Sequence, residues 1–167
     1  MIIDQRRAHQ RILYEQLLET INQPEKISQA ELYPQHIELA PADYILLMNM
    51  LEELQALGFD IRDMGKNSIV LYALPVGVSK ENPIQIVQKL ISELNEEGNL
   101  PLEKSKEQMA ISLAEAAAIA PNQQLSQEEM SELTGKLFAC KTPNISPKGK
   151  PTLITLEIEE IAKRLFK

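Results

Sequence analysis

Ser146-Pro147-Lys148-Gly149-Lys150-Pro151 runs directly into the apolar segment Thr152-Leu153-Ile154-Thr155-Leu156, and this stretch is the most informative feature of the chain. The β-branched and aliphatic residues of the apolar segment predict a strand. Lys148 and Lys150 belong to a basic cluster near the C-terminal end that also contains Lys136 and Lys141. A second basic cluster, formed by Arg6, Arg7 and Arg11, lies near the N-terminal end. The positive charge of the chain is therefore concentrated at its two ends.

Composition limits the classes of protein to which the chain can belong. Its 167 residues, 44% of them hydrophobic, have room for one domain or two small lobes with a packed interior. The net charge of −7 argues against a general polyanion-binding protein. The chain has no apolar run of about 18 residues, and Met1-Ile2-Ile3-Asp4 does not resemble a signal peptide. The single cysteine, Cys140, is typical of a reducing compartment, and we expect it to be a small buried residue.

Periodic apolar residues and turn residues predict alternating strands and helices. Strands are expected over 1–3, 32–39, 59–61, 68–74 and 152–156. Helices are expected over 5–21, from 41 to a stop at 58, from 83 to a stop at 98, and over 105–120, 126–139 and 158–166. The polar segment 95–106 is the expected joint between lobes. This order predicts an α/β or mixed α+β fold in which sheet and helices pack together.

Several motifs carry a resemblance to a known family. The last stretch resembles a Cys-Pro-His-Gly-Arg-Pro motif, and residues 4–15 resemble Asp-Gln-His-Ala-x-x-Glu-x-x-x-x-Glu. Between them lie Leu32-Tyr33-Pro34-Gln35, Gly65-x-Asn67 and Leu125-Ser126-x-Glu128-Glu129-Met130. None of these motifs is specific alone, but their order and spacing resemble the C-terminal dimerisation domain of MutL-type mismatch repair proteins over essentially the whole chain. This ordered set argues against an unrelated α/β ligand-binding domain.

The resemblance implies an architecture and a set of partners. It implies a homodimer with two lobes in each chain: a dimerisation lobe of residues 1–28 and 105–167, and an inserted regulatory lobe of residues 29–104. A start on a strand suggests a piece of a longer protein, whose ATP-binding N-terminal domain is not in this sequence. The implied partners are the replication sliding clamp, DNA and, through the full-length protein, the mismatch recognition protein MutS. The implied location is the bacterial cytoplasm, near the nucleoid.

The family's endonuclease motif is altered in this chain. Its metal-binding glutamate, cysteine and histidine correspond to Gln10, Ser146 and Lys148, while Asp4 and Glu15 remain as carboxylates. These carboxylates beside Arg6 and Lys148 are expected to form ion pairs rather than to bind metal, and His9 and His36 are expected in different lobes. The sequence therefore predicts a domain without a metal, a cofactor or nicking activity. The alternative is a metal-dependent nicking endonuclease with substituted ligands.

Two further segments are candidates for partner binding. Gln29, Leu32 and Pro34 fit the Gln-x-x-Leu-x-Pro pattern by which the family binds the sliding clamp, although a plain entry into a strand would give the same pattern. The second candidate is a set of cations that could hold a phosphate backbone without cutting it, and it predicts weak, non-specific DNA contact. That set consists of Arg6, Arg7, Lys148 and Lys150. The same cations would otherwise balance Asp4 and Glu15.

Overall fold

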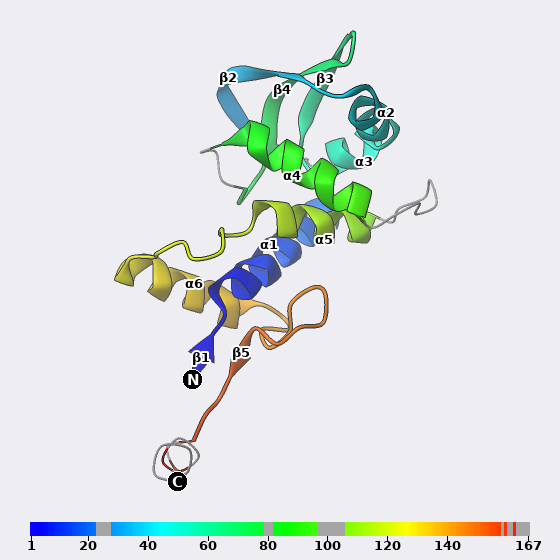
Figure 1. Cartoon of the computed structure of the whole chain (residues 1–167). Coiled ribbons are helices and arrows are strands. Elements are labelled where there is room, and N and C mark those ends of the chain that lie inside the picture. Colours follow the sequence, from blue (N-terminus) through cyan, green and yellow to red (C-terminus); the bar gives the residue numbers. More distant parts are fainter. Residues whose placement is uncertain (23–27, 79–81, 97–105, 158, 160–161, 163–167) are drawn as a thin grey trace. The chain divides into compact units, whose positions relative to one another are not determined.

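The computed structural model shows a mixed α+β fold with six helices and two small antiparallel sheets among the residues it describes. These residues are 1–22, 28–78, 82–96, 106–157, 159 and 162. The elements in chain order are β1 (Ile2–Ile3), α1 (Gln5–Asn22), β2 (Ser28–Glu38), α2 (Pro41–Asn49), α3 (Leu51–Ala56), β3 (Asp60–Gly65), β4 (Ser68–Pro75), α4 (Pro83–Glu96), α5 (Lys106–Ala117), α6 (Gln127–Ala139) and β5 (Leu153–Ile154) (Figure 1). None of the described helices is long and apolar enough to cross a membrane.

The chain divides into two compact units. Unit 1 combines Met1–Ile12 with Ala118–Lys167, and unit 2 is the continuous segment Leu13–Ala117. Unit 2 is thus inserted into unit 1 along the sequence, and helix α1 contributes its first part to unit 1 and its second part to unit 2. The lobe boundaries expected from the resemblance, with 29–104 as the insert, stay a prediction.

Unit 1 is built from both ends of the chain. Strands β1 and β5 pair antiparallel, with Ile2 opposite Ile154 and Ile3 opposite Leu153. Next to them lies a core of Ala8, Ile12 and Leu137, against which Ile3, Leu133, Cys140 and Leu153 pack. Helix α6 begins with the predicted capping box, in which Ser126 Oγ accepts from the Glu129 N–H at 3.2 Å and the Glu129 carboxylate accepts from the Ser126 N–H at 2.7 Å.

The sheet of unit 2 has three antiparallel strands in the order β2–β4–β3. Strands β3 and β4 form the predicted hairpin, whose turn residues Lys66 and Asn67 have φ of 53° and 60°. Both values are positive, as a two-residue turn of the type favoured in hairpins requires. One face of the sheet is apolar, and its buried residues are Ile37, Ile61, Ile69, Leu71 and Ala73.

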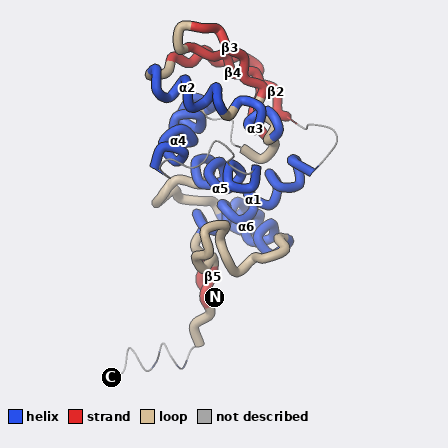
Figure 2. Tube along the Cα trace, turned by 90° about the vertical axis from the view of Figure 1, so that its right-hand side faces the viewer, coloured by secondary structure: helices blue, strands red, loops and turns tan. Residues whose placement is uncertain are grey.

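The helices of unit 2 lie beside this sheet. Helices α4 and α5 pack against each other, and α4 also contacts β2, while the strands lie together at one side of the unit (Figure 2). The buried residues of α4 are Ile86, Val87, Leu90, Ile91 and Leu94, at the spacing of an amphipathic helix. The buried residues of α5 include Met109, Ala110, Leu113 and Ala114.

The structure differs from the sequence-based expectations at a few points. The helix expected to begin at Pro41 is two helices, because Met50 adopts φ −116° and its N–H bonds the Leu47 carbonyl at 3.1 Å. The expected stop at Gly58 is confirmed, since its φ of 104° reverses the chain after α3. The strand expected over 152–156 is only Leu153–Ile154. Cys140 is half-buried rather than buried, because it is the cap residue at the end of α6. Most of the helix expected over 158–166 lies outside the described residues.

Candidate functional site

The last motif forms a closed turn around a buried serine. Ile145 and Pro151 make an isolated antiparallel bridge, and between them the Ser146 N–H donates to the Lys150 carbonyl at 2.7 Å. The Ser146 hydroxyl accepts from the Lys150 N–H at 3.1 Å, and Ser146 is 2% exposed. Gly149 has φ of 75°, which lets its N–H reach the Ser146 carbonyl at 2.9 Å. We call residues 145–151 the basic loop.

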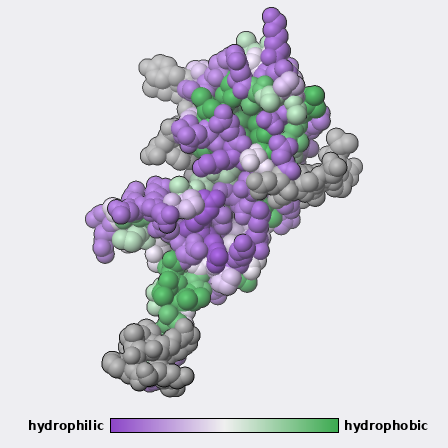
Figure 3. Space-filling view, viewed as in Figure 1, coloured by the Kyte–Doolittle hydropathy of each residue, from purple (hydrophilic) through white to green (hydrophobic). Residues whose placement is uncertain are grey.

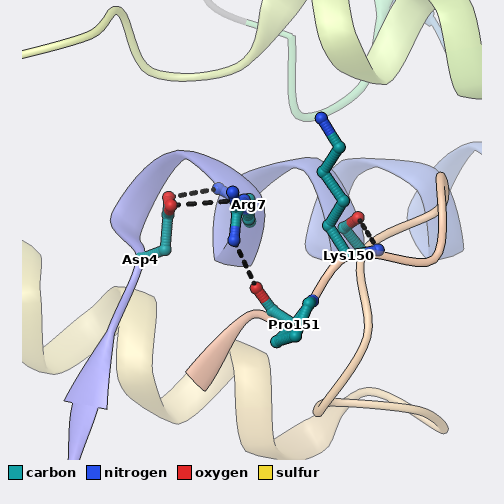
Figure 4. A network of polar contacts seen from close by, with 5 residues as sticks. Asp4, Arg7, Lys150 and Pro151 are labelled. Atoms are coloured by element: carbon teal, nitrogen blue, oxygen red, sulfur yellow. Dashed lines mark hydrogen bonds and ion pairs between the residues drawn. The ribbon is translucent and has the colours of Figure 1, made fainter. Parts of the chain in front are cut away.

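Two arginines of α1 hold the ends of the basic loop. Arg11 Nε donates to the Ile145 carbonyl at 2.6 Å, and Arg7 Nη1 donates to the Pro151 carbonyl at 3.1 Å (Figure 4). Asp4 orients Arg7, since its carboxylate accepts from the Arg7 N–H at 3.0 Å and lies 3.3 Å from Arg7 Nε. Arg11 is 8% exposed. The loop and the helix are therefore joined by guanidinium–carbonyl hydrogen bonds.

A second set of α1 side chains holds the segment between α5 and α6. Arg6 Nη1 donates to the Ile119 carbonyl at 3.0 Å, and His9 Nδ1 accepts from the Ile119 N–H at 3.1 Å. Gln5 Nε2 donates to the Gln123 carbonyl at 2.6 Å. Burial, with a smaller contribution from the nearby Lys136 ammonium, lowers the pKa of His9 from 6.5 to about 4. His9 is thus a neutral hydrogen-bond acceptor at neutral pH.

The residues of the altered endonuclease motif are distributed over both units. The expected ion pair of Asp4 is present, and its partner is Arg7. Gln10 is buried, and the Ser146 hydroxyl already accepts a backbone N–H. Within the described parts of the chain, His, Cys, Asp and Glu nowhere gather in a group of three that could hold a metal ion. Glu15 belongs to unit 2, whereas the other motif residues belong to unit 1.

The predicted DNA-binding cations lie in two kinds of environment. The guanidinium groups of Arg6 and Arg7 donate to the backbone carbonyls named above. Lys148 and Lys150 are exposed on the basic loop, and Figure 4 shows the Lys150 side chain extending away from the Pro151 carbonyl. The lysines are therefore the cations of this set that solvent reaches most freely.

The predicted clamp-binding residues lie on β2 of unit 2. Gln29 is opposite Leu74 in the β2–β4 ladder, and Pro34 is exposed. Leu32 lies in the part of β2 where the ladder is irregular, between Ala30 and Gln35. The side chains of Gln29 and Leu32 lie outside what the structure describes. For these two residues the structure gives the extended backbone and the register of β2.

The model of one known protein family, the MutL C terminal dimerisation domain, matches residues 1–125. This match places the chain in a class of domains defined by dimerisation, and it covers β1, both parts of α1, and the whole of unit 2.

Similar proteins agree with this class. The DNA mismatch repair protein MutL of Parabacteroides distasonis is 40% identical over 166 residues, which are 99% of this chain and 27% of that protein. The MutL proteins of Bacteroides fragilis and Chlorobaculum tepidum are each 38% identical, over 98% and 99% of this chain and 26% of either protein. The chain therefore belongs to the MutL C-terminal dimerisation domain family. It spans about a quarter of the length of these curated relatives.

Proposed function

We propose that this domain joins two copies of a bacterial mismatch repair protein, presents a segment that binds the sliding clamp, and does not cut DNA. In that protein, the ATP-binding part and the contact with MutS belong to segments outside this sequence. We place it in the cytoplasm, near the nucleoid.

The observation that carries the dimer is an exposed apolar pair on the smallest sheet. Ile2 and Ile154 are opposite each other in the β1–β5 ladder, yet they are 54% and 49% exposed. Met1 is exposed beside them, and Figure 3 shows apolar side chains gathered at this end of unit 1. Among the described residues this ladder consists of two strands, so each strand has one edge that no other described strand pairs with. A second copy would cover both the apolar pair and an edge.

Sedimentation equilibrium at micromolar concentration tests this proposal. The wild-type chain should have twice the mass of one chain, and Ile2→Glu combined with Ile154→Glu should shift it to the monomer, because four carboxylates would meet in the interface. Ile45→Glu is the matched control, since Ile45 is an equally exposed isoleucine of unit 2. A wild-type chain that stays monomeric would refute the dimer, and a double variant that stays dimeric would refute this location.

Clamp binding is proposed for Gln29, Leu32 and Pro34. The support is their spacing, the extended backbone of β2 and the exposure of Pro34, which together suit a peptide that enters a partner's apolar pockets. Leu32→Ala should weaken binding of the sliding clamp from the same cell by about 1–3 kcal/mol without affecting the dimer. Equal clamp binding by wild type and by a variant with alanine at all three positions would show that this segment is not the binding site.

The absence of nicking is proposed from the altered motif. A lysine at position 148 must lose its proton before it can bind a cation, and the Ser146 hydroxyl is already buried within its turn. We expect no stoichiometric zinc or manganese by elemental analysis and no nicking of supercoiled DNA. About one metal ion per chain, together with manganese-dependent nicking that Asp4→Ala abolishes, would instead establish the endonuclease.

Weak DNA binding is proposed for the cations at the two chain ends, namely Arg6, Arg7, Lys148 and Lys150. It should be electrostatic and should fall steeply with salt. Lys148 and Lys150 are exposed whereas Arg6 and Arg7 are partly buried, which suggests that the two lysines contribute more than the two arginines. Filter retention of a DNA duplex at several salt concentrations measures the effect.

A further inference from the structure

The three-stranded sheet of unit 2 has its two central irregularities at the same residue of β4. The register of β2 against β4 shifts between Ala30 and Gln35, and the register of β3 against β4 shifts between Asp60 and Ile61. The flanking pairs are Ala30↔Ala73 and Gln35↔Leu71 on β2, and Asp60↔Ala73 and Ile61↔Leu71 on β3. Tyr72 is the β4 residue between these pairs. Register shifts of this kind bend a strand and redirect a side chain, and they are frequent beside functional sites.

The shift on β2 places a long bulge opposite Tyr72. Residues 31–34 of β2 stand between the paired residues Ala30 and Gln35, whereas β4 has only Tyr72 at that level. The bulge contains Leu32 and Pro34, two of the three residues proposed to bind the clamp. Tyr72 therefore lies at the level of the sheet from which the proposed binding segment leaves the ladder.

The ring of Tyr72 also contacts a cation, the guanidinium group of Arg62. The Arg62 guanidinium carbon lies 4.3 Å from the centre of the Tyr72 ring, within the range of a cation–π contact. Asp60 Oδ1 is 3.6 Å from Arg62 Nε and helps to orient it. The Arg62 side chain is nevertheless 63% exposed, so much of the guanidinium edge faces solvent. This exposed edge offers N–H donors that are held in place by the ring and the carboxylate.

We propose that Arg62 and Tyr72 extend the partner-binding surface beyond the Gln29–Pro34 segment, with the ring of Tyr72 supporting the bulge and Arg62 binding acidic groups at the rim of the partner's pocket. This inference rests on the proposed clamp binding. The occupant is the same protein partner, because the pair lies on the sheet beside the segment that this partner would receive. The positive charge of Arg62 favours a partner with acidic groups at the rim of its pocket.

Charge and ring can be tested separately. Arg62→Glu should weaken clamp binding about tenfold and reduce its salt dependence, because a rim charge acts mainly on association and is screened by salt. Tyr72→Ala should weaken binding about threefold to tenfold, while Tyr72→Phe, which keeps the ring, should bind as wild type does. Lys89→Glu is the matched control, since it makes the same charge change at an exposed residue of α4 in the same unit.

Binding of the purified sliding clamp to the wild-type chain and to each variant should be measured by calorimetry at two salt concentrations. Unfolding curves and solution mass should confirm that every variant is folded and has the wild-type oligomeric state. The segment variant is the one with alanine at Gln29, Leu32 and Pro34. Weaker binding by the segment variant, by Arg62→Glu and by Tyr72→Ala, with binding kept in Lys89→Glu, supports the extended surface. Wild-type affinity in both Arg62→Glu and Tyr72→Ala, with loss in the segment variant, overturns this inference and leaves the proposed function intact. No binding by the wild-type chain overturns both.

Discussion

Acidification from pH 7.5 to about 5 should destabilise unit 1, because His9 binds a proton more weakly in the folded chain than in the unfolded chain. In the folded chain its Nδ1 accepts the Ile119 N–H at 3.1 Å, which is compatible only with a ring that carries no proton on that nitrogen. Burial is the main cause of its lowered pKa, and the Lys136 ammonium adds to it. Protonation must therefore break a backbone hydrogen bond and place a second charge near Lys136.

The direction of the pH effect on stability follows from the difference in the pKa of His9 between the folded and the unfolded chain. The pKa of His9 is about 4 in the folded chain and 6.5 in the unfolded chain, so the unfolded chain takes up the proton first as the pH falls. Stability contributed by neutral His9 is complete above pH 6.5 and is lost progressively as the pH falls toward 4. At about 1.4 kcal/mol per pH unit, the loss at pH 5 has an upper limit of about 2 kcal/mol. Partial contact of the ring with solvent reduces this to about 1–2 kcal/mol.

Urea unfolding at a fixed chain concentration measures the free energy of unfolding at each pH, and the fixed concentration keeps any dimer contribution constant. His9→Asn is the informative variant, because an asparagine oxygen can accept the Ile119 N–H but cannot titrate in this range. This variant should start less stable and lose less stability between pH 7.5 and 5. His36→Asn is the control, since it removes the other histidine of the chain, an exposed residue of β2.

Equal losses of unfolding free energy by wild type and His9→Asn over this pH range would show that His9 does not cause the pH dependence. An NMR titration midpoint near 6.5 for the His9 ring in the folded chain would show the same.

Three smaller changes have defined outcomes. Arg11→Met should destabilise unit 1 by about 1–3 kcal/mol in thermal unfolding, because the Ile145 carbonyl loses the guanidinium donor of a partly buried hydrogen bond. Ser126→Ala should lower the free energy of unfolding by about 0.5–2 kcal/mol through loss of the α6 cap, whereas Gln127→Ala, which leaves the cap intact, should change it by only a few tenths. Replacing Lys148 and Lys150 together by alanine should reduce DNA retention at low salt and make no difference at high salt; a difference that persists at high salt would argue against phosphate contact.

Local signals in the sequence predicted the local structure well. The Gly65-Lys66-Asn67 turn and the Ser126 capping box are present as expected, because each depends on a few adjacent residues. The break at Met50 was missed, since neither proline nor glycine marks it and its cause is a backbone conformation at one residue. The bulge in β2 was missed for a related reason, because a register depends on the partner strand as well as on the strand itself.

The environment of the candidate site was less predictable than its residues. Asp4 was expected to form an ion pair and does so with Arg7, but the sequence did not indicate that Arg7 and Arg11 would bond the two ends of the basic loop. Their spacing of four residues places them on one face of α1, and this was the available signal. The carbonyls they bind are about 140 residues away in sequence, and only the folded chain brings them together.

The pairing of β1 with β5 has a consequence for synthesis on the ribosome. Unit 2 is one continuous segment, so all of its residues are synthesised before the second part of unit 1. Ile2 and Ile3, by contrast, must wait for Ile154 and Leu153, which are translated near the end of this chain. Strand β1 and the apolar face of the first part of α1 are therefore made before their partners and stay without them until β5 has also left the ribosome. We expect nascent chains truncated before Leu153 to contain a folded unit 2 and an N-terminal segment that proteases and chaperones still recognise.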